Sequence, residues 1–283
     1  MPQWLLHIDR RWIFLAMLLG VGGPLLLGLQ LPEVPSPKTI AVYDAIENLP
    51  DGSTVLLSLD FDPASSGELE PMASAITRHC CEKKHRILYL TLWDRGVPMI
   101  QDSLDIIERE YPKREYGKDY VNLGYKAGGV VVIKNAVTNL RADFSRDQSG
   151  KSLDKLALTR ELKSLREMGL LISVGAGFPG PREWVQYAAA QYNLKIVAGA
   201  TGVQAPQLSP YSPEPLLGVL GAIKGAAEYE KLLLVRYPKL AKNPATSEGQ
   251  RRMGPQFVAH LLIVALIVAG NAASFWERWS TRR

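Results

Sequence analysis

The sequence predicts an α/β fold: a three-layer domain with a mostly parallel sheet and helices on both faces, flanked by N- and C-terminal transmembrane helices. Two apolar segments without Asp, Glu, Lys or Arg lie near the two ends, at 12–31 and 257–275. Between them, short apolar runs alternate with amphipathic helical patterns, which is typical of parallel strands covered on both faces. Hydrophobic residues make up 47% of the 283 residues, which is enough to build the core of a folded domain.

Each apolar segment has the length of a membrane-spanning helix, since roughly 20 residues at about 1.5 Å per residue cross a hydrocarbon core of about 30 Å. A cleavable signal peptide is the alternative for the first segment, but Pro32, Glu33 and Val34 follow it instead of the small residues of a cleavage site. The predicted organisation is a cytoplasmic segment 1–11, a transmembrane helix 12–31, a linker 32–38, a soluble α/β domain 39–238, a flexible linker 239–255, a transmembrane helix 256–276 and a cytoplasmic tail 277–283.

The orientation follows from basic residues near the apolar segments. Arg10 and Arg11 precede the first segment, and three more arginines follow the second. Because basic residues favour the cytoplasmic side, both termini are expected in the cytoplasm and the central domain outside it. Arg251 and Arg252 oppose this orientation, but a domain of this length is translocated largely regardless of its charge. The chain is therefore predicted to cross the cell membrane twice.

The first half of the domain is predicted to form a βαβ unit preceded by a helix. Ser65 and Glu68 have the spacing of a capping box, so a helix is expected to begin there. The apolar runs on either side of this helix are bounded by turn residues and predict buried strands. The expected elements are a helix 40–48, a strand 54–59, a helix 68–83 and a strand 86–93.

The second half repeats the alternation of strands and helices, with one ambiguous run. Residues 130–133 are a strand candidate or the beginning of a helix, because so short an apolar run fits both. The other expected elements are a helix 97–111, a strand 120–123, a helix 153–168, a strand 170–174, a helix 181–192, a strand 194–198 and a helix 215–237.

Three glycines fall within the last expected helix, namely Gly218, Gly221 and Gly225. Glycine lowers helix propensity by about 1 kcal/mol per residue, so several in one helix indicate that another element packs against the backbone. The neighbour is either the sheet or a second copy of the chain. These glycines are therefore the predicted packing or interface residues.

Charge, cysteine and histidine content exclude several classes of function. The net charge is +5 with a pI near 9.1, but much of the excess lies at the membrane flanks and in a linker, so nucleic-acid binding is not expected. Cys80 and Cys81 are adjacent, which is too strained for a disulfide between them. Of the four histidines, His79 and His85 alone lie in the domain, and their spacing does not suit a metal. No metal and no cofactor is predicted.

The motif with the clearest chemical meaning is Gly175-Ala-Gly177-Phe-Pro-Gly180, placed between an expected strand and an expected helix. A G-x-G-x-x-G turn in this context binds dinucleotides, because glycine lets the backbone approach a pyrophosphate. The prolines on either side of Gly180 remove N–H donors, and Thr201 stands near the end of the next strand instead of a ribose-binding acid. Binding of another anion or a small ligand, with Thr201 nearby, and a tight structural turn are the alternatives.

Two carboxylates end the first expected strand, at Asp60 and Asp62. This pattern resembles the start of haloacid dehalogenase-type phosphatases, and the resemblance implies Asp60 as nucleophile and Asp62 as acid. The sequence departs from that family at Pro63-Ala64-Ser65. Metal or ligand binding and the capping of neighbouring loops are the other interpretations of these carboxylates.

Two functions remain open. The first is a non-catalytic structural or interaction component of a membrane assembly, which contacts the lipid bilayer and either other copies of itself, as a homo-oligomer, or other subunits. The second is a small-ligand-binding or hydrolytic α/β domain with its site at the carboxyl edge of the sheet. The double tether and the absence of a recognisable catalytic set favour the first function.

Overall fold

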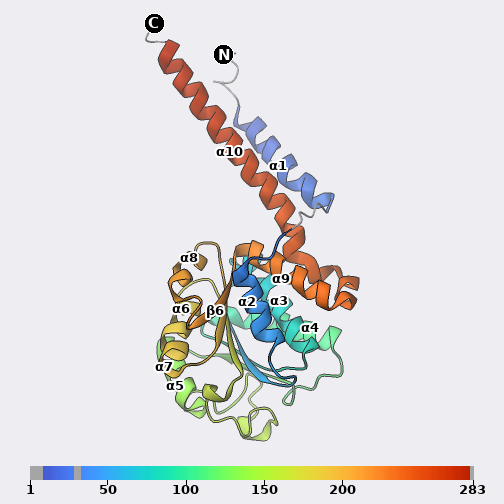
Figure 1. Ribbon diagram of the computed structural model, residues 1–283, viewed down its shortest axis with the longest axis vertical. Coiled ribbons are helices and arrows are strands. Elements are labelled where there is room, and N and C mark those ends of the chain that lie inside the picture. The colour runs from blue at the N-terminus through green and yellow to red at the C-terminus, as the bar shows by residue number, and fades with distance from the viewer. Residues whose placement is uncertain (1–8, 29–32, 281–283) are drawn as a thin grey trace. The chain divides into compact units, whose positions relative to one another are not determined.

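The computed structural model describes residues 9–28 and 33–280, which form two compact units (Figure 1). One unit is the α/β domain, Glu33–Gly249. The other is made of the parts of the chain that precede and follow it. Much of the predicted cytoplasmic segment, the end of the first apolar segment and the last residues of the predicted tail lie outside the described residues.

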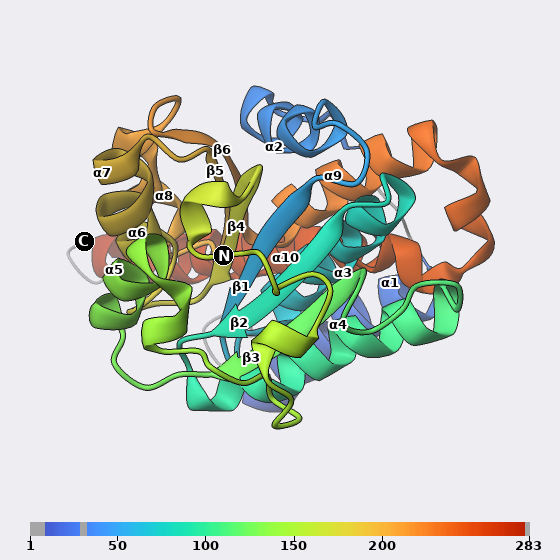
Figure 2. The ribbon, with the colours of Figure 1, turned by 90° about the horizontal axis from the view of Figure 1, so that it is seen from below.

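The α/β domain is built on a six-stranded sheet in which all neighbouring strands are parallel. The strands are β1 (Thr54–Asp60), β2 (Arg86–Thr91), β3 (Tyr120–Tyr125), β4 (Leu170–Gly175), β5 (Ile196–Ala200) and β6 (Leu216–Gly221). Their order is β3-β2-β1-β4-β5-β6 (Figure 2). This is the order of a Rossmann-like doubly wound sheet, and it confirms the predicted α/β class.

Helices cover both faces of this sheet (Figure 2). One face carries α2 (Pro37–Glu47), α3 (Ser66–Glu82), α4 (Val97–Glu110) and α9 (Ala222–Arg236). The other carries the shorter α5 (Val130–Thr138), α6 (Pro181–Trp184), α7 (Ala190–Tyr192) and α8 (Ala205–Leu208). Since every strand is covered on both faces, nearly all strand side chains are buried, which explains why the strand sequences lack polar alternation.

The expected helix over 215–237 was wrong in its first part, which forms β6. The run Leu-Leu-Gly-Val-Leu-Gly is a buried edge of the sheet, and the helix α9 begins only after Gly221. Glycine weakens a helix more than any other residue except proline. Burial of the apolar side chains beside β5 therefore favours a strand over this run. The ambiguous run at 130–133 belongs to α5, so its strand interpretation was also wrong.

The expected helix over 153–168 is replaced by two single-turn 3-10 helices, Leu153–Lys155 and Leu165–Glu167. The hydroxyl of Thr159 donates to the carbonyl oxygen of Leu153 at 2.7 Å, a side-chain bond that competes with a continuous helix. Ser164 and Glu167 then form a capping box that begins a new turn. Local side-chain bonds therefore override the helical pattern of this segment.

The segment 239–255, expected to be a flexible linker, forms helical turns over most of its length. It contains two 3-10 helices, Pro238–Lys242 and Pro244–Ser247, and the start of α10 (Glu248–Ser280). Thr246 is buried, and the guanidinium of Arg78 donates to the carbonyl oxygen of Ala245 at 3.3 Å. These contacts hold the part of the segment that belongs to the domain, up to Gly249, on α3, so polar composition did not indicate flexibility there.

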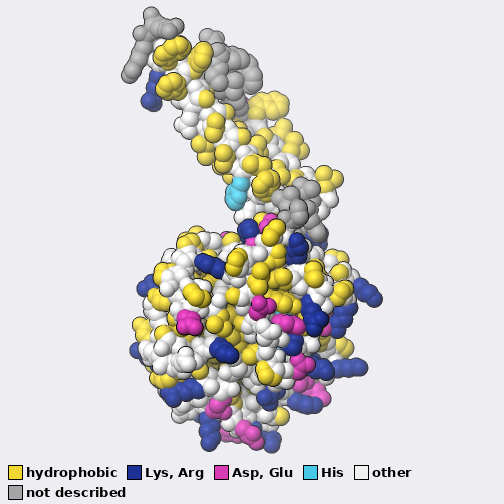
Figure 3. All heavy atoms as spheres, viewed as in Figure 1, with side chains coloured by type: hydrophobic (Ala, Val, Ile, Leu, Met, Phe, Trp, Pro, Cys, Tyr) yellow, Lys and Arg dark blue, Asp and Glu magenta, His cyan; other side chains and the backbone are white. Residues whose placement is uncertain are grey.

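The second unit contains α1 (Arg10–Leu26) and α10. α1 packs beside α10, because a Cβ placed on Gly20 would lie 3.2 Å from a side-chain carbon of Leu262. Many hydrophobic side chains lie on the visible surface of this helical unit (Figure 3), and Val264, Ile267 and Val268 of α10 are exposed.

Among the described residues, one helical stretch, Pro244–Trp276, is long and apolar enough to cross a membrane. α1 has 17 described residues and does not support the predicted N-terminal transmembrane helix. The two-pass arrangement and its orientation stay predictions.

Candidate functional site

The carboxyl edge of the sheet brings two of the predicted site residues together. β1 and β4 are neighbours in the middle of the sheet, and Asp60 pairs in register with Gly175 at their ends. The strand order reverses between these two strands, and ligands of open α/β sheets commonly bind at such a switch point. The chemistry available at this position depends on which polar atoms remain free.

Asp60 is fully buried, and both of its carboxylate oxygens are already bonded within the domain. Oδ1 accepts from the backbone N–H of Leu92 at 2.8 Å. Oδ2 accepts from the hydroxyl of Ser58 at 2.7 Å and from the indole N–H of Trp184 at 3.1 Å. Burial raises the pKa of Asp60 to about 7, although these donors lower it in part. The side chain therefore joins β1 to α6 and to Leu92, the residue that follows β2. A nucleophile would need an oxygen open to substrate, and both oxygens of Asp60 are bonded inside the domain.

Asp62 stays near the surface and closes a local turn, since its Oδ1 accepts from the backbone N–H of Ser65 at 3.2 Å. This is the loop-capping role expected of an Asp after a strand. Asp60 and Asp62 therefore make different contacts, which does not favour the arrangement of paired carboxylates that the phosphatase resemblance implies.

The glycine turn after β4 is tight and internally bonded. A Cβ on Gly175 would lie 2.6 Å from the ring of Pro181, and one on Gly180 would meet the carbonyl oxygen of Gly177. The N–H of Gly180 donates to Oε2 of Glu183 at 2.9 Å. A phosphate at this helix start would compete with that carboxylate. The geometry therefore favours a structural turn over a dinucleotide site.

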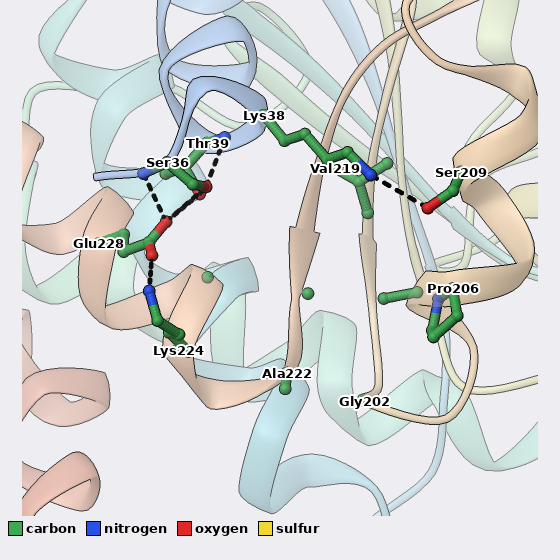
Figure 4. Close-up of a pocket in the computed structure, with 13 residues that line it drawn as sticks. Ser36, Lys38, Thr39, Gly202, Pro206, Ser209, Val219, Ala222, Lys224 and Glu228 are labelled. Carbon is green, nitrogen blue, oxygen red and sulfur yellow. Dashed lines mark hydrogen bonds and ion pairs between the residues drawn. The ribbon is translucent and has the colours of Figure 1, made fainter. Parts of the chain in front are cut away.

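A cavity of about 450 Å³ opens at the carboxyl ends of β5 and β6 (Figure 4). Its walls come from the start of α2, the loop after β5, α8 and the first turns of α9. Thr201 comes directly before the lining residue Gly202, and Gly221 and Gly225 belong to the wall. The sequence prediction missed the lining side chains on α2, because only the fold brings this helix to the end of β6.

Glu228 is the centre of the hydrogen bonds on one side of this cavity. It accepts from the N–H of Ser36 at 3.0 Å, from the Ser36 hydroxyl at 2.8 Å and from the Thr39 hydroxyl at 2.6 Å. Lys224 adds an ion pair. Burial by itself would raise the pKa of Glu228, but these donors hold it below its ordinary value. The carboxylate is satisfied, and it fixes the start of α2 to α9.

Lys38 supplies the free positive charge of the cavity. Its ammonium donates to the hydroxyl of Ser209 at 3.0 Å (Figure 4), and no carboxylate of the described residues forms an ion pair with it. The adjoining wall consists of small residues, including Gly202, Ala205 and Ala222. A cavity with one uncompensated ammonium and small apolar walls suits a small acid.

The three predicted packing glycines allow close approaches within the domain. A Cβ on Gly218 would lie 2.6 Å from the carbonyl oxygen of Lys38, where α2 crosses β6. One on Gly225 would lie 2.8 Å from backbone atoms of Leu220, and one on Gly221 would lie 3.1 Å from Cβ of Ala205. Gly221 and Gly225 thus shape the wall of the cavity, and Gly218 lets α2 approach β6.

A half-buried carboxylate, a buried histidine and a buried tyrosine also line up near the amino edge of the sheet. Nε2 of His79 lies 2.7 Å from Oε2 of Glu47, and Nδ1 lies 2.5 Å from the hydroxyl of Tyr229. Burial lowers the pKa of His79 to about 4, so the neutral ring donates to Glu47 and accepts from Tyr229. His79 and Tyr229 are fully buried, so this arrangement holds α2, α3 and α9 together. The described residues contain no cluster of three potential metal ligands.

Comparison with known proteins identifies no family. No protein-family model matches the chain, and no curated protein sequence matches it.

Proposed function

We propose that the chain is a membrane-tethered, non-catalytic binding domain that holds a small acidic ligand in the cavity between α2, α8 and α9. The observation that carries the proposal is the uncompensated ammonium of Lys38 beside a cavity of about 450 Å³ at the carboxyl edge of the sheet. Sites of this volume at this edge are common for small ligands in open α/β folds.

The perturbed ionisable groups support binding over catalysis. Asp60 and His79 carry pKa values shifted to about 7 and about 4, and shifted groups of this kind are the usual candidates for catalysis. Both side chains are fully buried and bonded to neighbours in the domain. A structural role explains their shifted pKa values without a substrate.

The attachment of the chain ends supports a tethered domain. The chain enters the domain at Glu33, whose carbonyl oxygen accepts from the ammonium of Lys231 at 2.5 Å. It leaves after Gly249, whose N–H donates to Oε1 of Glu230 at 2.9 Å. Both ends are thus fastened to α9, the helix whose first turns line the cavity. In the proposal, α10 and the N-terminal apolar segment hold the domain at the lipid bilayer, with both termini cytoplasmic.

A second candidate function is a component of a membrane assembly, formed by copies of this chain or by other subunits. Exposed apolar side chains at the carboxyl edge favour it: Phe178 is 71% exposed at the tip of the glycine turn, and Val203, after β5, is 77% exposed. This function requires the two side chains to contribute to one contact surface, because exposed apolar side chains mark such surfaces only when they form a patch.

The cavity is tested with the full chain in detergent and a short aliphatic carboxylate, hexanoate, as the probe. We expect hexanoate to bind the wild type and raise its melting temperature. Ala205→Phe should abolish binding by filling the cavity, and Lys38→Gln should weaken it about ten-fold by removing one charge-assisted contact. Lys155→Gln, an exposed lysine outside the cavity, is the matched control.

Equal hexanoate affinity in the wild type and Ala205→Phe would overturn the assignment of the cavity. No binding by the folded wild type, together with a defined oligomer in mild detergent, would favour the assembly function instead.

A further inference from the structure

A second cavity, of about 500 Å³, opens at the amino edge of the sheet. It lies beyond the ends of α3 and α4, before the chain enters β3. Cys81, Tyr111 and Pro112 give it an apolar part, and Lys84, Lys113 and Arg114 give it a basic part. None of these residues belongs to the cavity beside α9.

The acidic residues of this cavity do not neutralise its lysines. Glu110 uses both oxygens for the guanidinium of Arg78, at 2.8 Å each. Asp119 uses Oδ2 to accept from the N–H of Glu115 at 2.8 Å. Within the described residues, no ion pair joins a carboxylate to Lys84 or Lys113. The cavity therefore presents more positive than negative charge.

Arg114 adds a third positive charge that the fold holds in place without a carboxylate. Its guanidinium donates to the backbone carbonyl oxygens of His85 and Asp119, the latter at 3.0 Å. Its Nε is buried and has no hydrogen-bond partner among the described residues. Carbonyl oxygens orient the guanidinium but leave its net charge uncompensated. Two carboxylates line the cavity, and Arg78, which lies outside the lining, balances that of Glu110. The three cations of the lining therefore face one unbalanced carboxylate, that of Asp119.

We infer that this cavity binds a small dianion, specifically a phosphate monoester whose organic part is apolar. Two excess positive charges match a phosphate monoester near neutral pH. Lys and Arg are the side chains that proteins use to bind phosphate oxygens. Tyr111, Pro112 and Cys81 line the same cavity and offer a surface for a ring or an alkyl group. The inference is independent of the proposed function, because the two cavities share no residues and lie at opposite edges of the sheet.

Phenyl phosphate is the probe, measured by calorimetry with the full chain in detergent at low ionic strength. We expect binding to one site, with an affinity that falls as salt is added. Lys113→Gln should weaken binding about ten-fold, the effect of losing one charge-assisted contact. Lys84→Asn should act similarly, and asparagine is chosen because Lys84 has a φ of 58°, which asparagine tolerates.

Two controls distinguish this cavity from general attraction of anions. Lys118→Gln removes an exposed lysine that pairs with Glu115 outside the cavity, and it should leave phenyl phosphate affinity unchanged. Lys38→Gln should also leave it unchanged, because Lys38 lines the other cavity. Inorganic phosphate should bind more weakly than phenyl phosphate, because it leaves the apolar wall without a partner.

A folded wild type that does not bind phenyl phosphate would overturn the inference. So would equal losses of affinity in Lys113→Gln and Lys118→Gln, because these would indicate non-specific attraction. Melting temperatures of the variants confirm that each one is folded before its affinity is interpreted.

Discussion

Asp60 and His79 are buried side chains whose pKa values shift in opposite directions. Burial raises the pKa of Asp60 from 3.8 to about 7, so the folded state keeps a proton that the unfolded state has lost. The contribution of Asp60 to stability therefore falls as pH rises from about 4 to about 7. Burial lowers the pKa of His79 from 6.5 to about 4, so its contribution falls as pH decreases through that window. The two effects oppose each other in mildly acidic solution.

Substitution of Asp60 separates these effects. Asp60→Asn keeps the size of the side chain and an oxygen that can accept from the N–H of Leu92, but it no longer titrates. We expect the stability of the wild type relative to this variant to fall between about pH 4 and pH 7, and to stay constant above that range. By linkage, the raised pKa of Asp60 corresponds to a loss of stability on the order of 4 kcal/mol across this pH range.

The measurement is the melting temperature of both proteins across this pH range. The variant should keep the pH dependence that titration of His79 causes, so its stability should increase as pH rises from about 4 to 6.5. A difference between the two proteins that does not change with pH would show that the pKa of Asp60 is unshifted.

At the scale of elements, α9 connects the sheet, the cavity and both ends of the domain. It follows β6 directly, and its Gly225 lies against the backbone of Leu220. Its Glu228 holds the start of α2, and its Glu230 holds Gly249. A change in how α9 meets β6 would therefore alter the cavity and the attachment of the chain together.

Gly225→Ala is expected to destabilise the domain. The new Cβ would lie 2.8 Å from backbone atoms of Leu220, which cannot move as a side chain can. Overpacking of this kind costs about 1–3 kcal/mol. Gly67→Ala is the matched control, because Gly67 also lies in a helix and a Cβ there meets no atom within 4 Å.

Thermal unfolding of both variants tests this expectation. Gly67→Ala should leave stability unchanged or raise it by up to about 1 kcal/mol, because alanine favours the helix. If Gly225→Ala melts at the wild-type temperature, close packing between α9 and β6 is not what requires glycine at this position.

At the scale of the whole molecule, the number of membrane crossings and the side on which the domain lies decide which ligands can reach it. One helical stretch of the described residues, Pro244–Trp276, meets the length and hydropathy of a span. A single crossing places the termini on opposite sides of the membrane, whereas two crossings place them on the same side. The positions of the two termini therefore distinguish the arrangements.

We expect a tag at the N-terminus and a reporter after Arg283 both to report the cytoplasm. A protease site inserted at Ser149-Gly150, in an exposed turn of the domain, should be cut from outside the cell. This turn is preferable to the largely helical segment 239–255. A C-terminus found outside the cell would contradict the predicted orientation. Termini found on opposite sides of the membrane would show that the chain crosses it once.

Elements with strong local patterns could be predicted from the sequence. The strands β1, β2 and β4 were expected from apolar runs between turn residues, and α3 from its apolar face and the capping-box spacing at Ser65, because these signals depend on neighbours within a few residues. β6 was mistaken for a helix. Leu216–Gly221 is an apolar run that fits a helix or a strand, and pairing with β5 is what makes it a strand.

The amino-acid sequence alone was sufficient for the α/β class, the alternation of strands and helices and the apolar C-terminal helix, because composition and periodicity are local properties of the chain. Only the tertiary structure decided what the polar residues do. The indole of Trp184 reaches Asp60 across 124 positions of sequence, and Lys38 meets Ser209 across 171. Such contacts depend on strand order and helix packing, so the raised pKa of Asp60 and the cavity beside α9 exist only in the folded chain.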